Sequence, residues 1–189
     1  MKILSGIIAL VILALAGEAS ACVGKTITIG VPDAPDERVL GELVALLVTE
    51  RTGTTARVTT FADGNQVLAA VKRGDVGTLV ESTARALQVL GKPPARTAQE
   101  AYTVAKEGYR ARFSLVWLDP FAAGKQARSL FGPVLTTEVV RTFPALPRVI
   151  NKLTKVLTAE ELAQLAAAAR AGKDLKALAR DYLRAKKLI

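Results

Sequence analysis

The sequence predicts an α/β fold: a mostly parallel sheet flanked by helices and followed by C-terminal helices. Three observations lead to this prediction. Short β-rich segments alternate with segments of helical periodicity between residues 25 and 91. The joints between them are short, and parallel strands need a crossover that is usually a helix. From residue 136 onward the apolar spacing is helical throughout.

The first strand is predicted at 25–31, where "KTITIGV" alternates and is rich in Ile and Thr. Apolar residues at helical spacing predict a helix over 36–53, which we expect Asp36 to cap and Gly53 to end. The next elements are a strand, a helix that ends at Gly74 and a third strand, at 55–62, 65–74 and 76–81.

The remaining elements are predicted by the same signals. Helices are expected at 82–91 and 97–113, and a buried strand at 114–121 that Pro120 stops. Residues 122–132 have weak periodicity and predict a linker. A C-terminal helical segment at 133–189 follows. Its parts are two short helices divided at Pro144, a helix over 158–172 with a capping box from Thr158 to Glu161, and an amphipathic helix over 173–189.

The N-terminus has the pattern of a secretory signal. Lys2 precedes an apolar run of about fifteen residues, and Ala19, Ser20 and Ala21 follow it. This run is shorter than the roughly 20 residues that a membrane-spanning helix needs. We therefore expect residues 1–21 to be a signal peptide, and 22–189 to form one domain in the bacterial cell envelope, on the periplasmic or extracytoplasmic face.

The single cysteine, Cys22, directly follows the predicted cleavage site. This arrangement resembles a bacterial lipobox, in which the cysteine is acylated and becomes the mature N-terminus, although Ala19 stands where Leu is usual. We expect Cys22 to be lipidated and to anchor the chain to the membrane. The alternative is simple cleavage after Ala21, which leaves a free thiol.

Composition excludes several classes of function. The formal net charge is +9, and the chain has no histidine and one cysteine. A zinc site and a Cys or His nucleophile or base are therefore not expected, and we predict no metal, no cofactor and no enzyme activity. We do not expect nucleic acid as a partner, because the chain is predicted to be exported. The last helix carries a basic side, either a solvated face or a patch for anionic lipid or an acidic partner: Lys173, Lys176, Arg180, Arg184 and Lys187.

Two blocks of the chain resemble the substrate-binding proteins of ABC importers for glycine betaine, choline and related quaternary ammonium compounds. In the first block, a strand ending in Gly, a polar loop and a Leu-Gly-Glu-Leu tetrad at 40–43 match the family. The helix ending at 72–75 as Lys-x-Gly-acidic also matches, as do Glu81 and Thr83 within the family's Tyr-x-Glu-Tyr-Thr-Gly-Thr ligand segment.

The second block, from Pro133 to the C-terminus, resembles the end of the family's chain, with Phe-Pro-x-Leu and Thr-x-Glu-Glu-Leu in the same order. The resemblance implies the type II periplasmic-binding-protein fold. The family's second lobe would stand between residues near 120 and 133, where this chain has only the predicted linker. The resemblance therefore implies a single lobe, with 22–121 as its α/β part.

The ligand segment departs from the family's pattern. Leu79 and Ser82 stand where the family has aromatic residues, and Ala84 and Arg85 stand where it has Gly-Thr. Aromatic faces are the main means of holding a quaternary ammonium, which cannot donate a hydrogen bond. The resemblance thus implies a ligand site that is vestigial or altered, at the carboxyl ends of the first and third strands near 31–36 and 81–85.

Five polar residues are the candidates for this altered site. Arg85 would repel a cation or favour an anion, whereas Asp33, at the family's Asn position, and Glu81 would attract a cation. The alternative is that all of them cap helices and form ion pairs at the top of the sheet. The candidates are Asp33, Glu81, Ser82, Thr83 and Arg85.

Two functions remain open at the level of the sequence. The first is a solute-binding component of an ABC importer that works with a permease and binds a small quaternary amine or another small solute. A homodimer, or a second polypeptide that supplies the other lobe, would then complete the cleft. The second is a non-transport envelope protein that uses the same fold to bind a partner protein or anionic lipid.

Overall fold

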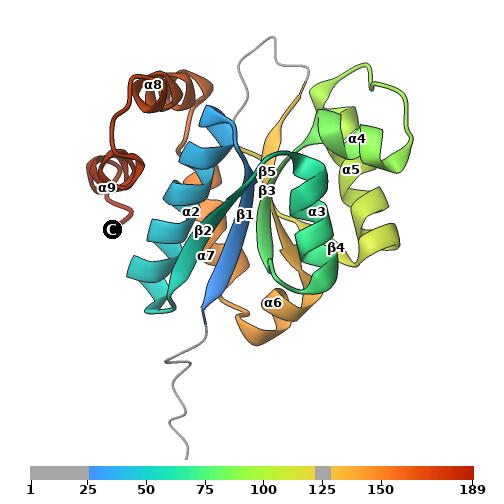
Figure 1. The fold of residues 1–189 in the computed structure, drawn as a ribbon, viewed down its shortest axis with the longest axis horizontal. Coiled ribbons are helices and arrows are strands. Elements are labelled where there is room, and N and C mark those ends of the chain that lie inside the picture. Colours follow the sequence, from blue (N-terminus) through green and yellow to red (C-terminus); the bar gives the residue numbers. More distant parts are fainter. Residues whose placement is uncertain (1–25, 122–128) are drawn as a thin grey trace, which may run out of the picture.

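Five strands form one sheet in the order β2-β1-β3-β5-β4 (Figure 1). The computed structural model describes residues 26–121 and 129–189. The strands are β1 (Ile27–Pro32), β2 (Ala56–Phe61), β3 (Thr78–Ser82), β4 (Leu115–Trp117) and β5 (Phe131–Thr136). β1 pairs in parallel with β2 and β3, and β5 pairs antiparallel with β3 and β4. The predicted α/β class is confirmed, with a mixed sheet that is parallel only in its β2-β1-β3 half.

β5 is an element that the sequence did not reveal. It begins at Phe131, inside the range that we expected to be a linker, and it occupies the start of the expected helical segment. Its sequence, FGPVLT, contains Gly and Pro, which usually mark turns and masked the strand pattern. Pro133 is tolerated because it lies opposite Val80 of β3 and beyond the end of the short β4. Residues 122–128 of the predicted linker lie outside the described residues.

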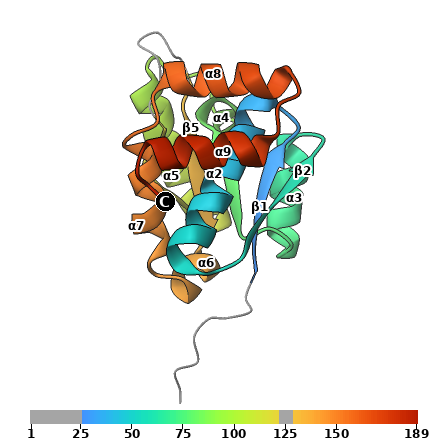
Figure 2. The ribbon, with the colours of Figure 1, turned by 90° about the vertical axis from the view of Figure 1, so that its left-hand side faces the viewer.

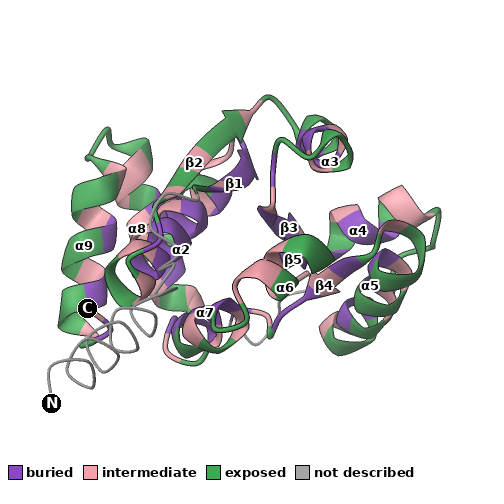
Figure 3. Cartoon of the chain, turned by 90° about the horizontal axis from the view of Figure 1, so that it is seen from below, coloured by how far each residue is buried: buried purple, intermediate pink, exposed green. Residues whose placement is uncertain are grey.

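Helices cover both faces of the sheet (Figures 1 and 3). One face carries α2 (Pro35–Thr52), α7 (Leu146–Thr154), α8 (Ala159–Arg170) and α9 (Leu175–Ala185). The other carries α3 (Gly64–Arg73), α4 (Thr83–Leu90) and α5 (Ala98–Phe113). The short α6 (Thr137–Thr142) follows β5. Figure 2 shows α8 and α9 in front of α2, so that they form an outer layer over that helix.

The two faces of the sheet have separate apolar cores. Neighbouring strand residues point to opposite faces, so Val80 packs in the α2 core and Leu79 in the α3–α5 core. Leu135 and Val134 of β5 divide in the same way. β3 and β5 are therefore buried on both faces, and neither shows the regular alternation of apolar and polar residues that marks a half-buried strand.

Most helix ends agree with the sequence signals. Gly53 and Gly74 end α2 and α3 with φ values of 70° and 84°, and Thr158 and Glu161 form the predicted capping box. The prediction that Asp36 caps α2 is wrong. Because Pro35 starts the helix, the N-cap position falls on Ala34, which makes no side-chain cap, and Asp36 lies in the first turn. None of the described helices is long and apolar enough to cross a membrane.

Candidate functional site

A cleft of about 540 Å³ opens at the end of the sheet where β1 and β2 finish. This is the upper end in Figure 1. It overlaps the region near 31–36 where we expected a binding site, and it adds the β2–α3 turn, which we did not anticipate. Its lining consists of Pro32, Asp33, Ala34, Glu37, Ala62, Asp63, Gly64, Asn65, Arg85, Gln88 and Val89.

Arg85, which lines this cleft, forms an ion pair with a buried carboxylate that does not line it. Glu81, at the end of β3, is 1% exposed, and its Oε1 lies 2.6 Å from Nε of Arg85, one turn into α4. Nη1 of Arg85 lies 3.3 Å from Oε1 of Glu37 in α2. The guanidinium therefore bridges two carboxylates that come from different elements. Glu81 and Arg85, which we predicted as site residues, are together, and Glu37 is the partner that the sequence did not reveal.

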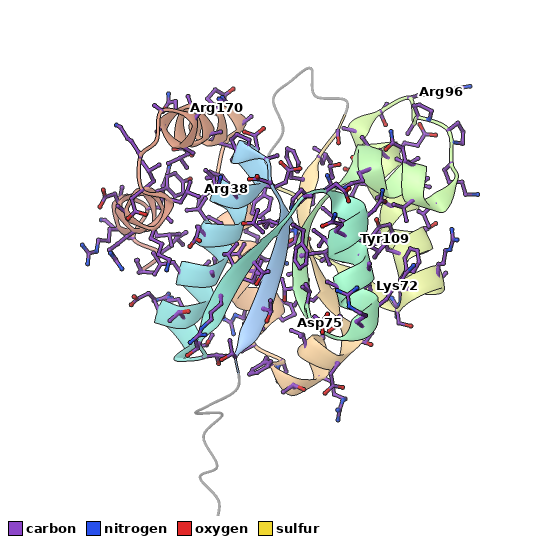
Figure 4. All side chains as sticks on the ribbon, in the orientation of Figure 1. Arg38, Lys72, Asp75, Arg96, Tyr109 and Arg170 are labelled. Atoms are coloured by element: carbon purple, nitrogen blue, oxygen red, sulfur yellow. The ribbon has the colours of Figure 1, made fainter. Side chains whose placement is uncertain are left out.

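Tyr109 supports the second oxygen of Glu81. It extends from α5 toward the sheet, is fully buried, and its hydroxyl donates a 3.0 Å hydrogen bond to Oε2 of Glu81 (Figure 4). The backbone N–H of Ser82 donates to Oε1 at 2.8 Å. Sequence reasoning placed Tyr109 on the buried face of its helix, but nothing in the sequence pointed to its carboxylate partner 28 residues away.

These contacts determine the ionisation of the site. Burial raises the pKa of Glu81, while the charge of Arg85, the Ser82 N–H and the Tyr109 hydroxyl act in the opposite direction. Burial, with the nearby Glu81 charge, also raises the pKa of Tyr109, so its hydroxyl stays a donor at all ordinary pH values. Burying the Glu81 carboxylate as a charge is thus unfavourable by itself, and its ionised form depends on these partners.

The side chains of Ser82 and Thr83 accept hydrogen bonds from backbone N–H groups instead of facing the cleft. Oγ of Ser82 accepts a 3.2 Å hydrogen bond from the N–H of Arg85 and thereby caps α4. Oγ1 of Thr83 accepts from the N–H of Leu130 at 3.0 Å, and the Thr83 N–H donates to the Leu130 carbonyl at 2.8 Å. Neither residue lines the cleft. Ser82 therefore caps a helix, as the alternative hypothesis expected, whereas the Thr83 side chain bonds to the backbone next to β5 and caps no helix.

Asp33 lies at the rim. Its Oδ1 is 3.3 Å from Nη1 of Arg38, and both side chains are largely exposed. An exposed pair of this kind contributes little to stability. Asp33 is the more accessible of the two acidic candidates, because Glu81 is buried. Asp63, which also lines the cleft, caps α3 by accepting from the N–H of Gln66 at 2.9 Å.

The chemistry available in this cleft is narrow. Its lining contains carboxylates, amides and one guanidinium, and none of the described lining residues is aromatic. The described residues also contain no group of three or more metal-ligating side chains. The cleft can attract a cation through Asp33, Asp63 and Glu37, but it offers no aromatic face to a quaternary ammonium.

Comparison with known proteins agrees with this architecture. Residues 25–131 match the family described as the substrate-binding domain of ABC-type glycine betaine transport systems. No curated protein sequence matches the chain significantly.

Two solved structures share the fold. One, described as a glycine betaine/carnitine/choline ABC transporter, has a TM-score of 0.77 at 13% identity, over 86% of this chain and 99% of that chain. The apo form of YehZ from Escherichia coli has a TM-score of 0.76 at 15% identity, over 88% of this chain and 100% of that chain. The family match covers more than half of the sequence, and the chain therefore belongs to the family of substrate-binding domains of ABC-type glycine betaine transport systems.

Proposed function

We propose that the chain is an exported, lipid-anchored solute-binding component of an ABC importer of the glycine betaine and choline type, with a degenerate ligand site. The observation that carries the second half of this proposal is the lining of the cleft. It lacks aromatic side chains among the described residues, and its one cation is already paired with Glu81 and Glu37. Family membership supports the first half.

Physical chemistry explains why such a site would bind weakly. Each aromatic face contributes about 0.5–2 kcal/mol to the binding of a quaternary ammonium. Good small-molecule sites also bury roughly 70–90% of the ligand, which a cleft on one lobe does not do. We propose that 22–189 is one domain in which 122–132 stands in place of a second lobe, and that a homodimer or a second polypeptide completes the cleft.

Titration calorimetry of the chain lacking residues 1–21 tests this proposal. Glycine betaine, choline and proline betaine are the ligands, and the mass of the protein in solution is measured alongside. Weak or no binding by a monomer supports a degenerate site. Micromolar binding by a monomer would contradict it, whereas micromolar binding by a dimer would show that two copies complete the cleft.

Export and anchoring are separate parts of the proposal. We propose that residues 1–21 are removed, that Cys22 is acylated, and that the protein faces the periplasm or the outside of the cell, next to an ABC permease. Mass spectrometry of protein purified from bacterial membranes tests this. The expected mass is that of a chain starting at Cys22 with acyl groups, and Cys22→Ser should leave the protein unprocessed. A mature chain without added mass would show simple cleavage instead.

We further propose that the chain is not an enzyme. Two of the carboxylates that line the described cleft are paired with Arg38 and Arg85, the third caps α3, and no described lining residue is an activated nucleophile. Hydrolytic turnover that is lost in Glu81→Gln would contradict this. Such an assay needs a folded variant, confirmed by its unfolding transition.

The second candidate function, an envelope protein that binds anionic lipid or an acidic partner, is favoured by α9. Five basic side chains on α9 and the residues that flank it are all exposed, and none makes an ion pair within the described parts of the chain: Lys173, Lys176, Arg180, Arg184 and Lys187. Co-sedimentation of the unlipidated chain with phosphatidylserine vesicles tests it. Binding that Arg180→Glu/Lys187→Glu removes, and that Arg110→Glu on α5 does not, would support this function over the importer.

A further inference from the structure

The guanidinium of Arg85 is held in the manner of a bound ligand. It lies in a position where carboxylates from α2 and β3 meet, with Nε 2.6 Å from Glu81 and Nη1 3.3 Å from Glu37. The two acids are 1% and 9% exposed at their side chains, whereas the Arg85 side chain is 22% exposed. The two acids are thus less exposed than the guanidinium that they hold.

Gly64 provides the room for this side chain. A Cβ atom added at Gly64, the first residue of α3, would overlap Cδ and Nε of Arg85. The stem of Arg85 therefore lies directly on the backbone where α3 begins. Three elements surround the guanidinium and its stem: α2, β3 and the start of α3.

The two acids of this place favour a cation. A carboxylate with little exposure to water either pairs with a counterion or loses its charge by protonation, because an unpaired buried charge is strongly unfavourable. If Arg85 ended at Cβ, the same place would be an anionic hollow that opens into the cleft, lined by Glu37, Glu81 and the free edge of Gly64.

We propose that Glu37, Glu81 and Gly64 form a binding site for a planar, hydrogen-bond-donating cation, and that the chain's own Arg85 fills it as a tethered ligand. We call these three residues the guanidinium socket. Two donors of one planar group reach the two acids, which a quaternary ammonium cannot do because it has no N–H. A cationic solute must displace Arg85, and a tethered competitor acts at an effective concentration on the order of millimolar.

The socket bears on the proposed function but is tested apart from it. The socket rests on the proposed function in one respect only: if the cleft is the solute site, Arg85 obstructs it. Betaine titration of the unaltered chain measures the proposed function, and the experiment below measures the socket in a variant. Failure of one does not imply failure of the other.

The test removes the tethered ligand and supplies a free one. In Arg85→Ala, we expect the thermal midpoint to fall, and methylguanidinium chloride to raise it by about 3–5 °C at tenfold its dissociation constant. The unaltered chain and Arg110→Ala, which removes an exposed arginine of α5, should show no such rise. Sodium chloride at equal concentration controls for ionic strength.

Two comparisons locate and classify the site. Arg85→Ala/Glu81→Gln should lose the response to methylguanidinium, because the buried acid is gone. Tetramethylammonium chloride should give a much smaller rise in Arg85→Ala, because it cannot donate hydrogen bonds. Equal stabilisation by the two cations would overturn the assignment to donating cations. A folded Arg85→Ala that no cation stabilises would overturn the socket itself.

If Arg85→Ala does not fold alone, recovery of folded protein after dilution from urea is the readout. Methylguanidinium should then restore refolding where sodium chloride does not. Refolding that methylguanidinium fails to restore would overturn the proposal.

Discussion

At the scale of single residues, the centre of this protein is one buried carboxylate. Glu81 forms an ion pair with Arg85 and accepts hydrogen bonds from the Tyr109 hydroxyl and the backbone N–H of Ser82. A carboxylate accepts through two oxygens, and here both are occupied by charged or polar donors. Removing any one donor leaves the charge in place with less support, so these residues are expected to be energetically coupled.

Tyr109→Phe is predicted to lower the free energy of unfolding by about 1.5–3 kcal/mol, because a hydrogen bond to a buried charged group is lost. The matched control is Tyr102→Phe on the same helix, whose hydroxyl donates to the neutral carbonyl of Leu118 at 2.9 Å. That change should lower it by only about 0.5–1.5 kcal/mol. Urea unfolding measures both variants, and equal losses would contradict the importance of the Glu81 charge.

The second residue-scale prediction concerns acid stability. A hydrogen bond from Lys186, and another from the backbone of Thr158, lower the pKa of Glu161 to about 2 from its usual 4.5. Because the folded state holds this carboxylate ionised, its stabilisation is present above pH 4.5 and is lost as the pH falls toward 2. The stability difference between the unaltered chain and Glu161→Gln should therefore shrink over that range.

Urea unfolding at a series of pH values measures this difference. The control is Glu160→Gln, which changes the neighbouring acid and should not reproduce the pH profile. A difference that stays constant from neutral pH down to 2 would contradict the ion-pair explanation.

The candidate site illustrates what residue-level reasoning can predict. Ser82 caps the helix that follows it, as its type and position indicated. The second partner of Arg85 could not be predicted, because Glu37 lies 48 residues away in the sequence and is brought to it only by the packing of α2 against the sheet. The side-chain direction of Arg85 follows from that packing, and not from any local signal.

At the scale of elements, the sequence predicted β1, β2 and β3 because each is followed by a helix that ends at a glycine or begins at a cap. It missed β5, which pairs only with distant partners: Leu79 faces Val134, and Trp117 also faces Val134 from the other side. A strand defined by such pairings, with Gly and Pro inside it, has no strong local pattern. Its existence is a property of the assembled sheet.

The packing of α2 on β1 gives a prediction at this scale. A Cβ added at Gly41 would lie 2.7 Å from Cγ1 of Val31, a β-branched side chain of β1 that has little freedom to move. Gly41→Ala should therefore lower the free energy of unfolding by about 1–3 kcal/mol, despite the better helix propensity of alanine.

Gly108→Ala in α5 is the matched control. Its added Cβ would meet the end of the Leu90 side chain, which can change rotamer. The gain in helix propensity, about 1 kcal/mol, should offset most of the destabilisation that this contact causes. Chemical denaturation compares the two variants, and a larger loss for Gly108→Ala would show that the α2–β1 contact is not the tighter one.

At the scale of the whole molecule, α9 completes the core on one face of the sheet. Ala179 and Leu183 of α9, and Leu188 just after it, pack in the same buried cluster as the apolar side of α2. The two leucines alone contribute roughly 3–6 kcal/mol by burial, which is a large share of the stability of an ordinary domain.

A chain that ends at Gly172 is thus predicted to lose its cooperative unfolding transition and to bind a hydrophobic dye. The control, Lys176→Ala/Arg184→Ala, removes charge from the exposed side of α9 and should unfold with an unchanged denaturant slope. Circular dichroism during urea titration distinguishes the two. A cooperative transition in the shortened chain would mean that α9 is an appendage and not part of the core.

The backbone on the two sides of residues 122–128 is held together by the sheet. Hydrogen bonds of 2.9 Å from Phe121 N–H to the Phe131 carbonyl and from Leu118 N–H to the Pro133 carbonyl hold these two ends side by side. A reporter protein whose own termini are adjacent could be spliced between them. The entropy of closing a loop grows slowly with its length, so the graft would leave the strand pairing intact.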